Sequence, residues 1–306
     1  MANAITLRVN EIPNLLDLVY KKASVTSILE KPSSLVRECE LASEIKIAKR
    51  ALTGYGDYNR STGYPAGSVT QTWETHAISY DRGIKFQVDR LDNDESGDNA
   101  FKDMASLGGQ FMREKATPEI DAVRFAVMAG TSGINTTTAA DLSTTTVKTA
   151  VDNGIAALDE DEVPEENRVL FMVTGVYNLM KNSGFFTYNL NANTGGNLDG
   201  RFAEYDGMPV IKVPQSRFYT AIDLYDAVTT GETSGGYAKA GAGVNINFMI
   251  VHQDAAIPAK TLDKMKYFSP DENQNADAHL LQSRLYHDLF VPEQKVEGIY
   301  LHKATA

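Results

Sequence analysis

The segment that decides the fold begins as Gly54-Tyr-Gly-Asp-Tyr-Asn-Arg60, continues through Gly63-Tyr-Pro-Ala-Gly67, and later becomes the alternating sequence Ile84-Lys-Phe-Gln-Val-Asp89. The first two pieces are rich in turn-forming residues and tyrosine, whereas the third has the period-two pattern of a half-buried strand. We therefore predict an extended β-hairpin arm over residues 51–92, with a tight turn at Asp81-Arg-Gly83. Because an isolated two-stranded hairpin is only marginally stable in water, we expect this arm to pack on a neighbouring subunit.

A long amphipathic helix is predicted to follow the arm, from Asn99 to Met128. Pro118 leaves two alternatives inside it, because Thr117 can cap a new helix or the proline can kink a continuous one. Apolar side chains recur at three- and four-residue spacing along one side. This stripe consists of Phe101, Met104, Ala105, Gly108, Phe111 and Met112, followed by Ile120, Val123 and Val127.

The rest of the chain alternates between helical and strand patterns, which predicts a compact α+β subdomain over residues 145–255. A glycine-rich insertion at 229–243 is expected to be flexible, and the last 50 residues return to strand patterns. Ala278–His287 fits both periodicities, so its structure stays undecided. The expected helices are 145–159 and 175–182, and the expected strands are 45–48, 169–173, 208–214, 248–251, 290–292 and 298–301.

The bulk composition narrows the function classes. A net charge of −11 argues against a protein that grips nucleic acid by neutralising phosphates. Cys39 is the single cysteine, which excludes an intrachain disulfide and indicates a reducing compartment. There is no apolar run long enough to span a membrane and no evident signal peptide, so we expect a soluble protein made in the cytoplasm.

Motifs for catalysis and metal binding are weak. Asp92-Asn-Asp-Glu-Ser-Gly97, with Asp103 at the twelfth position, approaches a calcium loop, but the eighth position is Asn99 and an Asp replaces the bidentate Glu. We favour an acidic helix N-terminus there, and a solvated turn for the acidic run Asp159–Glu166. No zinc, dinucleotide, phosphate-loop or nucleophile motif is evident, so we expect no enzyme, no metal and no cofactor.

Aromatic side chains in the arm are the best candidates for contacts between subunits, because large amphipathic rings dominate such contacts. Cross-strand packing within the hairpin is the simpler alternative. We favour the interface, since the arm is too long to cover itself. With two arginines of the same region, the candidates are Tyr55, Tyr58, Arg60, Tyr64, Trp73 and Arg82.

Several segments together resemble the major capsid proteins of tailed bacteriophages, in order and along nearly the whole chain. The resemblance is weakest in the two loops rich in threonine and glycine. The segments are Gly54–Arg60, Thr72-Trp-Glu-Thr75, Tyr80–Gly83 with Phe86–Asp89 and Asp92, Pro118-Glu-Ile-Asp-Ala-Val-Arg-Phe125, Ile257-Pro-Ala-Lys260, Lys266-Tyr-Phe-Ser-Pro-Asp-Glu-Asn273, Arg284-Leu-Tyr-His-Asp-Leu-Phe290 and Gly298-Ile-Tyr300.

The resemblance implies an α+β capsid fold in five parts. These are an N-terminal arm (1–50), an extended β-hairpin loop (51–95), a peripheral domain with a long spine helix (96–144), an axial domain (145–255) and the return strands of the peripheral domain (256–306). The insertion at 229–243 would be an axial loop.

The resemblance also implies a function. The chain would self-assemble into pentamers and hexamers that form an icosahedral head around phage DNA, without binding the DNA specifically. Its partners would be itself, a separate scaffold protein and a portal, and assembly would take place in the host bacterial cytoplasm. The alternatives are the shell protein of an encapsulin-type nanocompartment, or a metal-dependent hydrolase that uses Asp92, Asp94 and the 159–166 carboxylates.

Overall fold

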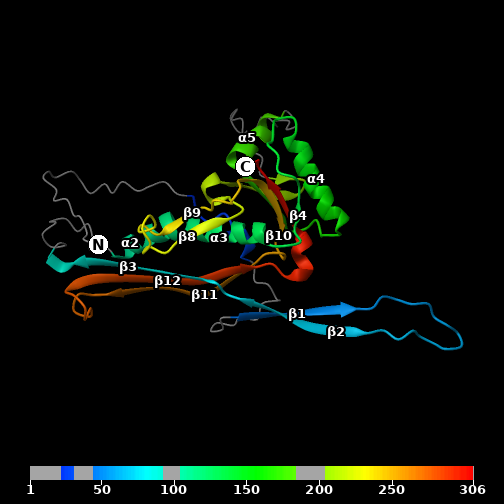
Figure 1. The fold of residues 1–306 in the computed structure, drawn as a ribbon, viewed down its shortest axis with the longest axis horizontal. Coiled ribbons are helices and arrows are strands. Elements are labelled where there is room, and N and C mark those ends of the chain that lie inside the picture. The colour runs from blue at the N-terminus through cyan, green and yellow to red at the C-terminus, as the bar shows by residue number, and fades with distance from the viewer. Residues whose placement is uncertain (1–21, 31–43, 92–103, 184–203, 306) are drawn as a thin grey trace, which may run out of the picture.

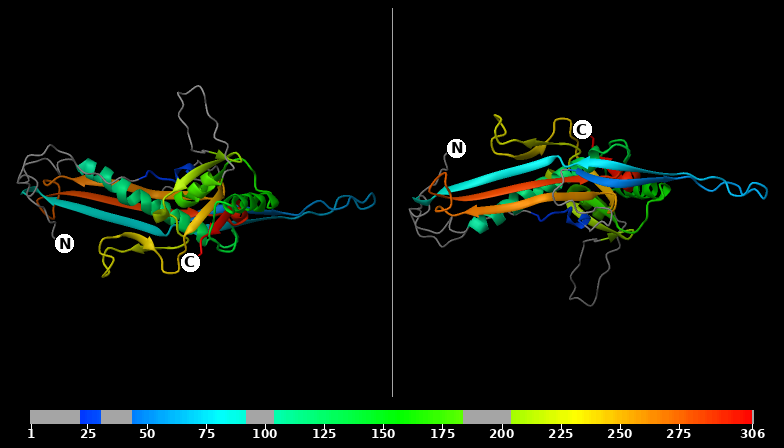
Figure 2. Two further views of the ribbon diagram at one scale, coloured as in Figure 1. Left: turned by 90° about the horizontal axis from the view of Figure 1, so that it is seen from above. Right: turned by 90° about the horizontal axis from the view of Figure 1, so that it is seen from below.

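The computed structural model describes residues 22–30, 44–91, 104–183 and 204–305. The molecule is elongated (Figure 1). A long three-stranded sheet with a helix lying along it forms one half, a compact α+β part forms the other, and a narrow hairpin projects beyond the compact part. Figure 2 shows from above and below that the sheet and the hairpin extend along the same long axis. No helix among the described residues is long and apolar enough to cross a membrane.

The long sheet is antiparallel, in the order β11 (Ile257–Phe268), β12 (Ala278–Phe290) and β3 (Tyr80–Asp89). The strand predicted around residues 84–89 is confirmed, and the undecided segment from Ala278 is strand. The predicted turn at Asp81–Gly83 is wrong. These residues pair with Tyr286–Arg284 of β12, and this ladder keeps turn-prone residues extended.

The helix predicted from Asn99 to Met128 is present from Met104 onward as one continuous helical rod, and residues 99–103 lie outside the described part of the chain. It consists of α2 (Met104–Phe111), a π-helical turn (Met112–Ala116) and α3 (Thr117–Gly130), called here the spine helix. Thr117 keeps helical dihedral angles and donates its hydroxyl to the Met112 carbonyl at 2.9 Å. The continuous alternative therefore holds. The wider π turn lies where Pro118 lacks an N–H and its ring would crowd the preceding turn.

The compact part is built on a six-stranded sheet whose two middle strands are completely buried. The order is β4 (Asn135–Thr136), β13 (Ile299–Lys303), β10 (Ile246–His252), β5 (Arg168–Val173), β7 (Met208–Val213) and β6 (Glu204–Tyr205). Helices α4 (Val147–Glu160) and α5 (Thr174–Asn182) flank it. The helices and strands expected between residues 145 and 251 are confirmed to within two residues at most boundaries.

Three pairings differ from the expectations. β13 pairs with β10 in the six-stranded sheet, and only β11 and β12 of the C-terminal region extend the long sheet. The insertion at 229–243 contains β9 (Gly236–Lys239), which pairs with β8 (Ile222–Tyr225), so part of it is ordered as a hairpin. The projecting hairpin consists of β1 (Glu44–Leu52) and β2 (Val69–Ala77), and β3 pairs with β12 instead.

Gly154 in α4 allows this helix to approach the six-stranded sheet closely. A Cβ atom added there would meet the Tyr300 ring at 2.8 Å and Ile250 Cδ1 at 3.1 Å. We expect Gly154→Ala to lower the free energy of unfolding by roughly 1–3 kcal/mol, because a packed core cannot absorb the added methyl group.

The matched control is Gly109→Ala in α2, where an added Cβ meets nothing within 4 Å. This control should be neutral or stabilising by up to about 1 kcal/mol, since alanine favours helix. Urea denaturation of both variants measures the difference. Equal stability of the two would contradict the close approach at Gly154.

Candidate assembly surfaces

The projecting hairpin has a fixed base and an uncovered outer part. Its strands pair from Glu44 with Ala77 to Leu52 with Val69, and residues 53–68 form the tip. Alternation along β1 places Ile45 and Ile47 toward the body, where both are buried. They join a small apolar cluster that also contains Ile78, Ile257, Ala259 and Phe290.

Polar contacts fix the same base to the 3₁₀ helix η4 (Glu293–Gly298). The Glu74 carboxylate accepts a hydrogen bond from the Glu293 backbone N–H, at 3.3 and 3.2 Å to its two oxygens. Lys49 forms an ion pair with the Glu293 side chain, and the Gln294 amide donates to the Arg50 carbonyl at 3.2 Å. These contacts set the direction in which the hairpin leaves the body.

The outer part of the hairpin exposes large apolar surface. Trp73 is 62% exposed, and the register places its side chain on the same face as Leu52 and Val69. Leu52 and Val69 were missed in the sequence, because only the pairing register shows that they lie on the same face as Trp73. The polar pair Arg50–Gln71 lies between Trp73 and the other two residues on this face. Large apolar side chains exposed on one face mark interaction sites. We call Leu52, Val69 and Trp73 the hairpin stripe.

The tip carries the predicted tyrosines. Tyr55 and Tyr64 are almost fully exposed, and Tyr58 is 60% exposed. The Tyr58 and Tyr64 rings contact each other edge to face, with centroids 5.0 Å apart. The rings therefore pack partly within the hairpin, as the simpler alternative proposed, but both side chains remain mostly exposed to solvent. Arg60 is exposed at the same tip.

Arg82 differs from the other predicted interface residues, because its guanidinium is bound inside the subunit. Its Nε donates to Glu119 Oε1 at 2.6 Å, which ties β3 to the spine helix. Its terminal nitrogens donate to the carbonyls of Tyr225 and Gly236, at 2.9 and 3.2 Å. Arg82 thus holds the long sheet, the spine helix and the β8–β9 hairpin together.

A buried carboxylate joins the N-terminal segment to the spine helix. Asp121 of α3 is completely buried, and its Oδ2 forms an ion pair with Arg217 Nη1 at 2.9 Å. Arg217 belongs to the 3₁₀ helix η3 (Gln215–Arg217). A charge in the interior must be paired and hydrogen-bonded to be tolerated. The segment around Thr26 supplies the remaining donors to Asp121. These are Ser24 Oγ at 2.8 Å, Val25 N at 3.1 Å, Thr26 N at 3.3 Å and Thr26 Oγ1 at 2.6 Å.

Two buried arginines complete this anchor. Arg124, one helical turn after Asp121, donates to Thr26 Oγ1 at 2.9 Å and to Glu30 at 2.6 Å. Arg217 also donates to the backbone carbonyls of Lys22 and Ala23. These roles were not identified from the sequence. The available signal was a carboxylate and a guanidinium three positions apart on the side of the helix that is otherwise apolar.

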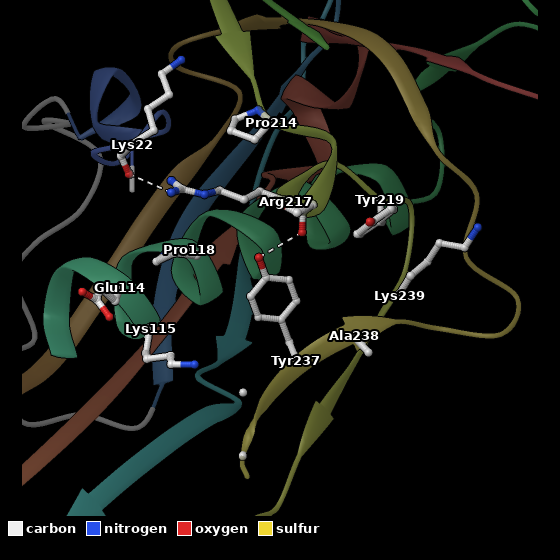
Figure 3. A pocket seen from close by; sticks show the side chains of 13 residues that line it. Lys22, Glu114, Lys115, Pro118, Pro214, Arg217, Tyr219, Tyr237, Ala238 and Lys239 are labelled. Atoms are coloured by element: carbon white, nitrogen blue, oxygen red, sulfur yellow. Dashed lines mark hydrogen bonds between the residues drawn. The ribbon is translucent and has the colours of Figure 1, made fainter. Parts of the chain in front are cut away.

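A hollow of about 540 Å³ opens beside this anchor, between the π turn, η3 and the β8–β9 hairpin (Figure 3). Its charged lining is mainly cationic, from Lys22, Lys115 and Lys239. Burial, together with the nearby Lys212 and Arg217, lowers the pKa of Lys22. Tyr237 donates its hydroxyl to the Ser216 carbonyl at 3.0 Å, and burial raises the pKa of Tyr237 to about 12. This lining includes no nucleophile paired with a base.

The described residues contain no group of three or more His, Cys, Asp or Glu side chains placed to hold a metal ion. Within the acidic run at 159–166, Asp159 pairs with Arg168 at 2.7 Å and Asp161 accepts a hydrogen bond from Asn135. The calcium-like sequence at 92–97 with Asp103, and Cys39, lie outside the described residues.

Comparison with known proteins identifies the fold. No protein-family model matches the sequence, and no curated protein sequence matches it. Solved structures do match over nearly the whole chain. In the capsid structure of the cyanophage P-SCSP1u, the matching chain is 15% identical with a TM-score of 0.67, over 97% of this chain and 93% of that one.

Two further capsid structures give the same result. The mature capsid of bacteriophage PhiM1 matches with 13% identity and a TM-score of 0.68, over 98% of this chain and 92% of that one. The capsid of Myoviridae phage XM1 matches with 13% identity and a TM-score of 0.55, over 99% and 100% of the two chains. The protein therefore has the fold of tailed-phage major capsid proteins, and the predicted α+β capsid fold is confirmed.

Removing the charge of Asp121 should destabilise the subunit strongly. We expect Asp121→Asn to lower the free energy of unfolding by roughly 3–5 kcal/mol, because Arg217 is left buried without its counter-charge. Asp263→Asn is the control, since the exposed Lys260–Asp263 pair should contribute less than about 1 kcal/mol. Urea denaturation compares the two. A loss below 1 kcal/mol for Asp121→Asn would refute the anchor.

His287 makes stability depend on pH. It is buried under the spine helix in β12, with its ring stacked near Tyr80 and neither ring nitrogen hydrogen-bonded to the described residues. Burial, followed by the charges of Arg124, Lys260 and Arg82, lowers the pKa of His287 to about 4, while Asp263 acts in the opposite direction. The folded state therefore favours the neutral ring.

Below pH 6.5 the unfolded chain takes up a proton on His287 that the folded chain does not take up until about pH 4. Stability attributable to this residue is therefore lost as the pH falls from 6.5 to 4, by about 3 kcal/mol in total. We expect His287→Phe to flatten the stability profile in that window, as measured by urea midpoints at pH 7, 5.5 and 4.5. Parallel profiles for the variant and the wild type would contradict this role.

Proposed function

We propose that this chain is the major shell protein of a tailed-phage head, assembling into pentamers and hexamers that close as an icosahedral shell around phage DNA. The observation that carries the proposal is the fold, which is shared over nearly the whole chain with several phage capsid structures. Fold alone does not define function. The surfaces of this chain supply the second part of the argument.

The hairpin is built to contact another molecule. Its base is rigidly attached, whereas the hairpin stripe and the tip tyrosines have little cover from the described residues. A two-stranded hairpin gains little stability by itself, so a neighbouring subunit is the natural cover. In this proposal Trp73, Tyr55, Tyr58 and Tyr64 are contact residues, with Arg60 beside them, and Arg82 supports the subunit from within.

The division into parts is proposed on the same basis. Residues 1–50 form the N-terminal arm, 51–95 the extended loop, 96–144 the spine-helix region, 145–255 the axial domain and 256–306 the return strands. Of the return strands, β11 and β12 lie in the long sheet, whereas β13 pairs with β10 of the compact part. The Asp121 anchor supports an arm that is held against the spine helix at residues 22–30. The insertion at 229–243 is the proposed axial loop, and Arg82 holds the strands of the β8–β9 hairpin against the long sheet.

Charge is consistent with a DNA container. At −11 the chain stays soluble, and its net charge limits adhesion to packaged DNA. A separate scaffold protein and a portal are the further partners in this proposal, and assembly takes place in the host bacterial cytoplasm. Many modest contacts, repeated in every subunit, stabilise a closed shell far more than any single contact does.

Deletion of Arg60–Gly67 tests the proposal. We expect the shortened subunit to unfold at the same urea concentration as the wild type, because the hairpin base is untouched, but to form no closed particles. Light scattering and negative-stain microscopy are the measurements, with neighbouring phage proteins co-expressed. Normal particles from the deletion would remove the tip from assembly, and a wild-type chain that stays monomeric under these conditions would refute the shell.

A further inference from the structure

The face of the long sheet that points away from the spine helix is basic. Directly opposed residues in a sheet share a face. Lys264 lies opposite Arg284, and Lys266 lies opposite Gln282, which in turn lies opposite Lys85 of β3. Their side chains are exposed, while the alternate residues, such as Leu281 and Leu285, are buried. Figure 2 shows this face in the view from below. We call Lys85, Lys264, Lys266 and Arg284 the basic face.

Two carboxylates, Asp81 and Asp89, share this face with the four cationic side chains. Asp81 binds Arg284 through two hydrogen bonds, at 2.9 and 2.5 Å. The three lysines have no ion pair among residues 22–30, 44–91, 104–183 and 204–305. Like charges on neighbouring strands destabilise a sheet. Their concentration in a chain of net charge −11 therefore calls for a physical reason.

A simpler explanation is protection of the sheet edges. β3 and β11 are the outer strands of this sheet, and lysines on edge strands discourage pairing with other chains. That role depends on charge but not on its sign, so glutamate would protect as well as lysine. Binding of an acidic surface depends on the sign. Charge reversal therefore separates the two explanations.

We propose that the basic face binds the acidic segment Asp159–Glu166 of a second copy of this chain, an inference that rests on the shell function proposed above. The segment follows α4 and is largely exposed. Asp159 and Asp161 have partners inside the subunit. The other four carboxylates of the segment have no ion pair within the described part of the chain. They belong to Glu160, Glu162, Glu165 and Glu166.

The two surfaces cannot meet within one subunit. The acidic segment is at the compact end, where Asn135 bonds to both Asp161 and the Glu297 carbonyl of η4. On the basic face, Arg284 lies opposite Lys264. Six residues of extended strand separate Arg284 from Phe290, the end of β12 nearest the compact part, which is a distance of roughly 20 Å. Figure 1 shows α4 and this part of the sheet on different parts of the molecule. An ion pair needs contact within about 4 Å, so the partner must be another copy.

Such a contact would act mainly on specificity and assembly rate. Exposed charge pairs contribute little individually, but complementary charges steer encounter and fix the relative position of two surfaces. Repetition in every subunit multiplies a small effect. The contact should therefore weaken as the salt concentration rises.

The test is charge reversal with rescue. Lys264→Glu/Lys266→Glu should raise the protein concentration needed for particle formation about tenfold or more, with unchanged subunit stability. Arg113→Glu, at an exposed basic residue of the π turn outside the basic face, is the control and should assemble like the wild type. Adding Glu160→Lys/Glu165→Lys to the reversed chain should restore assembly, because the two surfaces are again complementary. Light scattering over a concentration series measures all four proteins.

Each outcome separates the possibilities. If wild-type particles form and the reversed chain assembles equally well, the lysines protect edges and this inference is wrong. If reversal prevents assembly without rescue, the basic face binds some other partner, and the acidic segment is excluded. If the wild type never forms particles, the shell function itself fails, and this pairing fails with it.

Discussion

The subunit depends on one buried carboxylate. Asp121 places a full charge in the interior of the spine helix, and such a charge is tolerated only when every oxygen is satisfied. Arg217 from the compact part and the backbone and hydroxyl groups near Thr26 satisfy it together. Three segments far apart in the sequence must therefore arrive at one point before the charge is stabilised. This requirement fixes the N-terminal segment and the compact part relative to the spine helix.

Other polar contacts extend the same frame. Arg82 links the long sheet to Glu119 of the spine helix and to the β8–β9 hairpin, so both faces of the helix are tied to neighbouring elements. The apolar core of the compact part supplies most of the burial, through strands β5 and β10. Polar contacts thus determine how the parts are arranged, while the core stabilises each part.

Much of the fold could be predicted from local patterns, because β5, β10, α4 and the spine helix have clear periodicity and burial. The predictions failed where a partner distant in the sequence decides the structure. Asp81–Gly83 has the composition of a turn, yet β12 holds it in a strand. The exposed aromatics of the hairpin were identified from the sequence, but Leu52 and Val69 required the register. Asp121 and Arg124 could not be assigned, because nothing local identifies their partners.

The distribution of buried and exposed contacts along the hairpin bears directly on the proposed assembly. Residues near the base of the hairpin are buried or paired with η4, whereas the stripe and tip are open and held by little besides their own strand pairing. An element that is rigid at its base reaches a neighbour with little loss of orientational freedom, so more of its contact energy remains for binding. In the proposed shell, a subunit with this surface uncovered depends on net charge to stay in solution before assembly, and the chain has a net charge of −11. In the proposed shell, the same negative charge would make the basic face a selective contact for other copies, which would connect solubility before assembly to recognition during it.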